Sequence, residues 1–320
     1  MATERKFDVY CGFPSYGGNG GISSEVPDIR QWFARWLVNA KEDPRVGHII
    51  ELTVGDTPIT MVRNRFVVEA KRLGCDILLM VDSDINPNLH AGEPGYREFW
   101  ESSFEFFCDH YERGPCVIGA PYCGPPGYEK GRENVYVFQW QEHGDHGSET
   151  VFSLEQVPRM MAAQMKGIQP CAALPTGMIM YDMRVFDLIE PSTLSAEDIL
   201  EQLILGEITK HEAIRMLRPG YFYYEWKTPH AADKASTEDV TNTRDISLAG
   251  CAKYGYNPVY CNWDAPVGHW KPWCVRGKPI IYGAENVAAT FREVVLQDIH
   301  TDEAIIEASN VSCRDAKAGA

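Results

Sequence analysis

Several features that define other protein classes are missing from this chain of 320 residues. Its ten cysteines include no C-x-x-C pair, which argues against a zinc ribbon or a disulfide framework and predicts reduced thiols. No apolar run is long enough to span a bilayer. The charged residues 1–6 lead directly into a strand-like stretch, so we expect no signal peptide. These absences predict a cytoplasmic protein.

Basic residues are also scarce, because 30 Lys and Arg face 45 Asp and Glu and the net charge is −15. This balance argues against a broad nucleic-acid surface, which needs a basic excess to displace counterions. It leaves room for one local basic groove. An anionic small ligand can still bind if a metal ion supplies positive charge beside it. With 44% hydrophobic residues, the chain is long enough for one large globular domain.

A complete G-x-G-x-x-G phosphate-binding motif is missing as well. Residues 9–13 indicate a first strand, which leads into a glycine-rich loop over residues 14–21. Ser23 stands where the third glycine of the motif would be. The loop is therefore either a flexible segment over a ligand or an imperfect phosphate cradle.

Two carboxylates mark the most informative point of the chain. Residues 77–81 form a short apolar run that begins soon after Gly74 and ends in Asp82-Ser83-Asp84. Such a run predicts a buried strand, and open α/β sheets bind ligands at the carboxyl ends of their strands. Two oxygen donors at that position suit Mg²⁺ or Mn²⁺. The alternative is that the Asp-Ser-Asp tripeptide only makes a turn after the strand.

The neighbouring segments alternate between strands and helices. Residues 46–54 indicate a second strand, Thr57-Pro58 a helix start, and Gly74 the end of that helix. A strand, helix, strand unit of this kind is parallel and right-handed. The sequence therefore predicts an α/β fold with a mostly parallel central sheet flanked by helices. Arg63 and Asn64, in the middle of the helix, lie either on a solvated face or toward the crevice that holds the aspartates.

The second half of the chain repeats the pattern of a polar motif beside a short strand. Pro175-Thr176-Gly177 bends into an apolar strand at residues 178–181. Thr237-Glu238-Asp239 opens a helix that ends at Gly255. One more strand follows, and Gly268-His269 comes after it. These motifs are candidates for the same site as the two aspartates.

Other segments carry no predicted chemistry. Two capping-box patterns predict a small helical insert over about residues 195–217. Two histidines in residues 143–146 are more typical of a polar surface turn than of a metal site. Residues 285–297 indicate a last helix, and residues 302–320 are expected to form a poorly ordered tail.

In this order, the motifs resemble those of the metal-dependent glycosyltransferases of the GT-A fold. The matching set is a helix with Arg-Asn, a strand ending in Asp-x-Asp, a Thr-Gly-Met-Ile-Met-Tyr segment, a helix opened by Glu-Asp, and a late Gly-His. The resemblance covers roughly residues 7–269. It implies a single Rossmann-like domain over residues 7–297. It also implies transfer of a sugar from a nucleoside diphosphate to an acceptor hydroxyl.

The same resemblance implies a role for each matching residue. Asp82, Asp84 and His269 would coordinate the cation, and imidazole suits Mn²⁺ better than Mg²⁺. The alternative without a functional role is that His269 is a surface residue and that Gly177 only allows the chain to bend before the strand at residues 178–181. The donor-binding residues implied by the match are Pro14, Arg63, Asn64, Asp82, Ser83, Thr176 and Gly177.

Asp239 is the candidate catalytic base, with Glu238 beside it. A base must take the proton of the acceptor hydroxyl as that hydroxyl attacks the anomeric carbon. In inverting members of the fold, the acidic pair at this helix start supplies such a base. Retaining members use no base here, and Thr237-Glu238-Asp239 alternatively serves only as a helix cap.

Three other functions compete with this prediction. A nucleotidyltransferase would also bind a metal and a nucleotide, but the basic glycine-rich signature expected after the first strand is missing. A non-catalytic nucleotide- or carbohydrate-binding module would use the same residues. The third alternative concerns the acceptor of the sugar, which is a modified base in DNA instead of a glycan or a protein. The net negative charge argues against extensive contact with a DNA duplex but is compatible with the binding of one flipped base.

Overall fold

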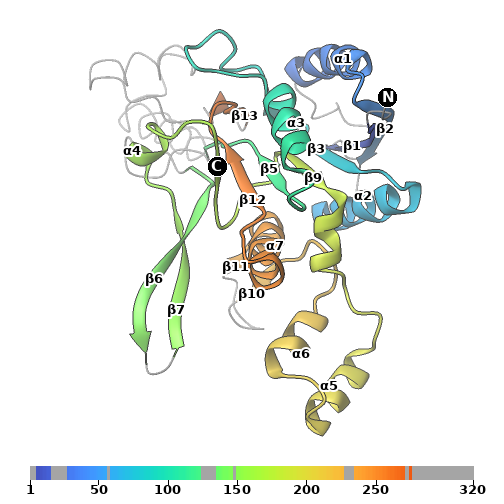
Figure 1. Ribbon diagram of the computed structural model, residues 1–320, viewed down its shortest axis with the longest axis vertical. Helices are drawn as coiled ribbons and strands as arrows, with labels where there is room; N and C mark the ends of the chain where they lie inside the picture. The colour runs from blue at the N-terminus through green and yellow to red at the C-terminus, as the bar shows by residue number, and fades with distance from the viewer. Residues whose placement is uncertain are drawn as a thin grey trace, which may run out of the picture.

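The structure is a computed structural model that describes residues 5–15, 27–55, 58–123, 135–146, 149–226, 234–270 and 274–275. Figure 1 shows a central sheet with helices on both faces. The strands are β1 Phe7–Ser15, β2 Val46–Gly55, β3 Ile77–Val81, β4 Ile85–Asn86, β5 Val117–Gly119, β6 Phe138–His146, β7 Glu149–Gln156, β8 Ile168–Pro170, β9 Met178–Asp182, β10 Glu225–Trp226, β11 Lys234–Ser236, β12 Val259–Asn262, β13 Gly268–Trp270 and β14 Cys274–Val275. The helices are α1 Pro27–Glu42, α2 Ile59–Leu73, α3 Phe99–His110, α4 Arg159–Ala162, the 3₁₀ helix η1 Met183–Leu188, α5 Ala196–Leu205, α6 Lys210–Met216 and α7 Glu238–Tyr254.

The central sheet has seven strands in the order β2-β1-β3-β9-β5-β12-β8. β1 is parallel to both β2 and β3, and β12 is parallel to β5. β9 runs antiparallel to β3 and β5, and β8 runs antiparallel to β12. Five strands therefore point one way and two point the other. The predicted α/β fold with a mostly parallel sheet and flanking helices is confirmed.

The core follows from the alternation of side chains along the buried strands. In β3, Ile77 and Leu79 belong to one apolar cluster, together with aromatic residues of α1 and α3. Leu78 and Met80 point to the other face and pack in a second cluster with residues of α2, η1 and α7. A strand with both faces covered needs an unbroken apolar run, which is what residues 77–81 provide. Packing on both faces therefore fixes the position of β3 and of the residues that follow it.

The C-terminal ends of α2 and α7 and the starts of α5 and α6 agree with their sequence signals. Gly74 and Gly255 adopt left-handed conformations, with φ of 69° and 73°, and end α2 and α7. Ser195 and Thr209 form the two predicted capping boxes, at the starts of α5 and α6. The helical insert is therefore present, and it extends away from the sheet at one end of the molecule (Figure 1).

Two predictions about local structure are wrong. Residues 143–146 are part of β6, which pairs with β7 in a long antiparallel hairpin, instead of forming a surface turn. The aromatic run at residues 221–226 also predicts a strand, but only Glu225–Trp226 form one, β10. At residues 143–146 the polar sequence weakens the alternation that marks a strand, and pairing with β7 decides the outcome. At Tyr221 and Phe222 the backbone is hydrogen-bonded to the side chain of Asn64 instead of to a neighbouring strand. Several predictions lie outside the described residues: the glycine-rich loop beyond residue 15, Thr57 at the helix start, the helix at 285–297 and the tail at 302–320.

Replacement of Gly12, in the middle of β1, should destabilise the fold. A Cβ atom at this position would lie 2.6 Å from Cδ2 of Phe66, a core residue of α2. We expect Gly12→Ala to lower the free energy of unfolding by about 1–3 kcal/mol through overpacking, as measured by urea denaturation. The double variant with Phe66→Leu should lose less than the sum of the two single losses. A Gly12→Ala protein as stable as the native one would contradict the packing described.

Candidate functional site

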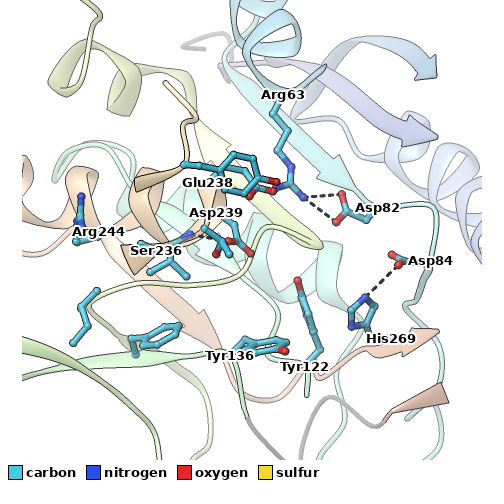
Figure 2. Close-up of a pocket in the computed structure, with 15 residues that line it drawn as sticks. Arg63, Asp82, Asp84, Tyr122, Tyr136, Ser236, Glu238, Asp239, Arg244 and His269 are labelled. Atoms are coloured by element: carbon cyan, nitrogen blue, oxygen red, sulfur yellow. Dashed lines mark hydrogen bonds and ion pairs between the residues drawn. The ribbon is translucent and has the colours of Figure 1, made fainter. Parts of the chain in front are cut away.

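The candidate site lies at one edge of the sheet. The parallel strands β3 and β5 both end at this edge, and β9 begins there, because Val81 pairs with Met178. A pocket of about 620 Å³ opens beyond them (Figure 2). Its lining residues are Arg63, Asp82, Asp84, Tyr122, Tyr136, Phe138, Leu154, Tyr224, Ser236, Thr237, Glu238, Asp239, Val240, Arg244 and His269.

Arg63 connects three elements in the wall of this pocket. Its Nη2 atom donates to both carboxylate oxygens of Asp82, at 3.1 and 2.9 Å. Its Nη1 atom donates to Oε1 of Glu238 at 2.8 Å. All three side chains are buried, and that of Arg63 is only 3% exposed. A single cation from α2 therefore holds the end of β3 and the start of α7, which lie 19 and 175 residues away in the sequence.

Burial makes the charged state of Asp82 costly. Loss of water around this carboxylate raises its pKa above the usual range, the guanidinium of Arg63 opposes that shift, and nearby Asp84 adds to it. Removal of one partner from a buried ion pair leaves an uncompensated charge. The ionised form of Asp82 therefore depends on Arg63.

Asp84 and His269 meet although they lie 185 residues apart. Nε2 of His269 lies 3.2 Å from Oδ2 of Asp84. The reason is the pairing of β13 with β4, which sets His269 opposite Ile85, the residue after Asp84. The imidazole also packs edge-on against the ring of Tyr122, with centroids 4.9 Å apart. The structure thus brings together two of the three predicted metal ligands.

Asp82 does not complete a three-residue metal group. Within the described ranges, no three His, Cys, Asp or Glu side chains come close enough together to hold an ion. An oxygen from Asp84 and a nitrogen from His269 nevertheless fit Mn²⁺, which fills its other positions with water and phosphate oxygens. Nδ1 of His269 is buried and has no hydrogen-bond partner among the described residues. This nitrogen is not the one that faces Asp84, so a water or a ligand group is expected on the other side of the ring.

The start of α7 supplies two further carboxylates with different surroundings. Glu238 is buried and paired with Arg63, whereas Asp239 is half-buried and lines the pocket. Oδ1 of Asp239 accepts hydrogen bonds from the hydroxyl of Thr237 and from the backbone N–H of Val240, the latter at 2.9 Å. Of the two candidate catalytic residues, Asp239 is therefore the one that is not held by a buried ion pair.

The other predicted donor-binding residues are described but are not part of the pocket lining. Asn64 uses its side-chain amide to hold the backbone of Tyr221 and Phe222, with contacts of 2.8–3.1 Å. The carbonyl of Gly177 accepts the backbone N–H of Asp82 at 2.8 Å. The remaining three, Pro14, Ser83 and Thr176, are buried.

These three residues have different neighbours. Pro14 pairs with Val54 between β1 and β2. Ser83 lies in the turn between the two aspartates. The hydroxyl of Thr176 has no partner among the described residues.

Sequence reasoning missed the aromatic wall of the pocket. It consists of Tyr122 after β5, Tyr136 and Phe138 at the start of the β6–β7 hairpin, and Tyr224 before β10. Burial, followed by the carboxylates of Asp239 and Asp82, raises the pKa of Tyr122 well above its usual value. Its hydroxyl therefore stays protonated. The signal available in the sequence was the position of Tyr122 just beyond a short buried strand.

Comparisons with known proteins give no family for this chain. No family model matches it, and no curated protein matches it. The structure described as A197 from STIV has 13% identity and a TM-score of 0.39, over 86% of this chain and 96% of that one. HddC from Yersinia pseudotuberculosis, in complex with GMP-PN, has 9% identity and a TM-score of 0.26, over 56% and 78% of the two chains. Among the described residues, no helix has the length and apolar character needed to cross a membrane.

Replacement of Arg63 by methionine should strongly destabilise the protein. Met keeps much of the apolar stem but leaves Asp82 and Glu238 buried without their cation. We expect a loss of about 3–5 kcal/mol in the free energy of unfolding, as measured by urea denaturation. Arg65→Met, at an exposed position of the same helix, is the control and should change stability by no more than about 0.5 kcal/mol. Equal, small losses in both variants would contradict the bridging role of Arg63.

Proposed function

We propose that this protein is a metal-dependent glycosyltransferase of the GT-A type, which transfers a sugar from a nucleoside diphosphate to an acceptor hydroxyl. The observation that supports this proposal best is the pairing of Asp84 with His269 in the pocket at the carboxyl end of β3. The motif order of the sequence supports the same function. The two structural likenesses are too weak to add an argument.

The charge of the pocket supports a role for a divalent cation. Four carboxylates line it, those of Asp82, Asp84, Glu238 and Asp239. Arg63 is engaged by two of them, and Arg244 is bound to Asp245 and Glu225, at 3.0 and 2.6 Å. A diphosphate would therefore meet excess negative charge, which a bound cation offsets.

In this proposal Asp84 and His269 hold the cation, and Asp82 stays with Arg63. When bound, Mn²⁺ or Mg²⁺ supplies Lewis-acid stabilisation of the charge that develops on the leaving diphosphate. The short turn from Asp82 to Ile85, closed by a backbone hydrogen bond of 3.1 Å, holds Asp84 in place for this task. The buried position of His269 beside Tyr122 limits the movement of its ring.

Asp239 acts as the catalytic base in the inverting form of the reaction. Its carboxylate lines the pocket, whereas the neighbouring Glu238 is engaged by Arg63. Figure 2 shows Asp239 and the Asp84–His269 pair on opposite sides of the hydroxyl of Tyr122. This separation matches the chemistry, because the proton leaves the acceptor while charge accumulates on the diphosphate. The aromatic wall on the side of Asp239 then faces the acceptor.

Release of nucleoside diphosphate tests the function as a whole. The purified protein would be incubated with a panel of nucleotide-sugars, with Mn²⁺, with Mg²⁺ and with a chelator. We expect at least one donor to release nucleoside diphosphate, and only when a divalent cation is present. In a parallel incubation with nucleoside triphosphates and sugar phosphates, release of pyrophosphate would instead indicate a nucleotidyltransferase. Donor binding without any release would indicate a binding module.

Replacement of Asp239 by asparagine should remove chemistry but not binding. The side-chain oxygen of asparagine can still accept from Thr237 and Val240, so the start of α7 should keep its structure. We expect kcat for sugar transfer to fall by about 10²–10⁴-fold, with the Kd for the donor nearly unchanged. A native rate would make Asp239 a helix cap. Loss of donor binding would place it in the sugar-recognition shell, and either outcome favours a retaining mechanism.

Cation affinity should depend on Asp84 and His269 together. We expect Asp84→Ala and His269→Ala each to weaken Mn²⁺ binding at least about tenfold in calorimetric titrations, because each variant removes one of two protein ligands. His90→Ala is a matched control, since His90 is buried and paired with Glu93 outside the pocket. Unchanged Mn²⁺ affinity in both site variants would reject the proposed cation site.

A further inference from the structure

The helical insert carries an unusual concentration of exposed apolar side chains. Ile204 is 83% exposed, and five more large apolar residues of residues 194–217 are more than a third exposed. Within the insert, Ile199 and Ala213 are the buried residues of α5 and α6. A hairpin of two short helices has too little interior to bury the others. The six exposed residues, here called the insert patch, are Leu194, Leu200, Ile204, Leu205, Ile214 and Leu217.

Charged residues flank the insert patch in a specific pattern. On α5, Glu197 and Glu201 each lie three residues before Leu200 and Ile204, so an acidic edge borders the apolar stripe. On α6, Lys210 lies one helical turn before Ile214, and Arg215 follows it directly. These four charged residues are exposed. We call Glu197 and Glu201 the acidic edge of α5, and Lys210 and Arg215 the basic edge of α6. Asp198 and Glu212 are also exposed, and their carboxylates are engaged in the capping boxes of the two helices.

We propose that the insert patch is the interface of a homodimer. A two-fold axis places α5 of one copy against α6 of the other, and each contact then occurs twice. This arrangement brings the acidic edge of each α5 to the basic edge of each α6, and the apolar residues are covered between them. An anionic membrane is a poorer fit, because helices that lie on such membranes carry Lys and Arg along their polar face.

The apolar contact is tested by the oligomeric state of the full chain in solution. Sedimentation velocity over a hundredfold range of protein concentration should show a monomer–dimer equilibrium. Ile204→Asp should shift the protein to monomer, with unchanged circular dichroism. Val38→Asp, on α1, is the matched control at an exposed apolar position outside the insert, and it should dimerise like the native protein. A native protein that stays monomeric throughout would overturn the proposal and leave the patch to a different partner.

The charge pattern is tested by exchanging the sign of each edge. The variant with Glu197→Lys and Glu201→Lys has two basic edges, and the variant with Lys210→Glu and Arg215→Glu has two acidic edges. Each should be monomeric alone, because like charges would face each other across the two-fold axis. A 1:1 mixture should form a heterodimer. Dimers of either variant alone, or a mixture that stays monomeric, would overturn the pairing of α5 with α6.

Discussion

The bridge from Arg63 to Asp82 and Glu238 is the interaction on which the pocket depends. It joins α2, the end of β3 and the start of α7 through one buried guanidinium. Desolvation of these charges costs free energy, which offsets much of their attraction. The bridge therefore contributes more to fixing one arrangement of α2, β3 and α7 than to the net stability of the fold. Arginine suits this task because its planar guanidinium offers several donors in a rigid geometry. Through its two partners, the bridge also sets the positions of their neighbours Asp84 and Asp239.

Arg63 thereby divides four chemically similar carboxylates into two classes. Asp82 and Glu238 are buried and held by the guanidinium. Asp84 lies beside an imidazole, and Asp239 lies at the start of a helix facing the pocket. In our account, the first pair maintains the architecture and the second pair carries the chemistry. The Asp-Ser-Asp segment after β3 supplies one carboxylate to each class, and the Glu238-Asp239 pair at the start of α7 supplies the other.

The sequence was informative where local physics decides the structure. The short apolar run at residues 77–81 predicted a buried strand, and Gly74 and Gly255 marked the ends of two helices. It was less informative where the outcome depends on distant partners. Arg63 pairs with Glu238, which is 175 residues away, and Asn64 binds the backbone near Phe222. The sequence around these residues gives no indication of either contact. The continuation of β6 through residues 143–146 was missed because this polar segment is specified by its pairing with β7.

We propose that Asp84 and His269 hold a divalent cation while Arg63 stays bound to Asp82 and Glu238. The most direct test is a crystal structure with Mn²⁺ and the nucleoside diphosphate released in the donor assay, with anomalous scattering data collected at the manganese edge. We expect one manganese peak bonded to a carboxylate oxygen of Asp84 and to His269, with both Arg63 ion pairs intact. A peak bonded to Asp82 with Arg63 displaced, or no peak in the pocket, would contradict it.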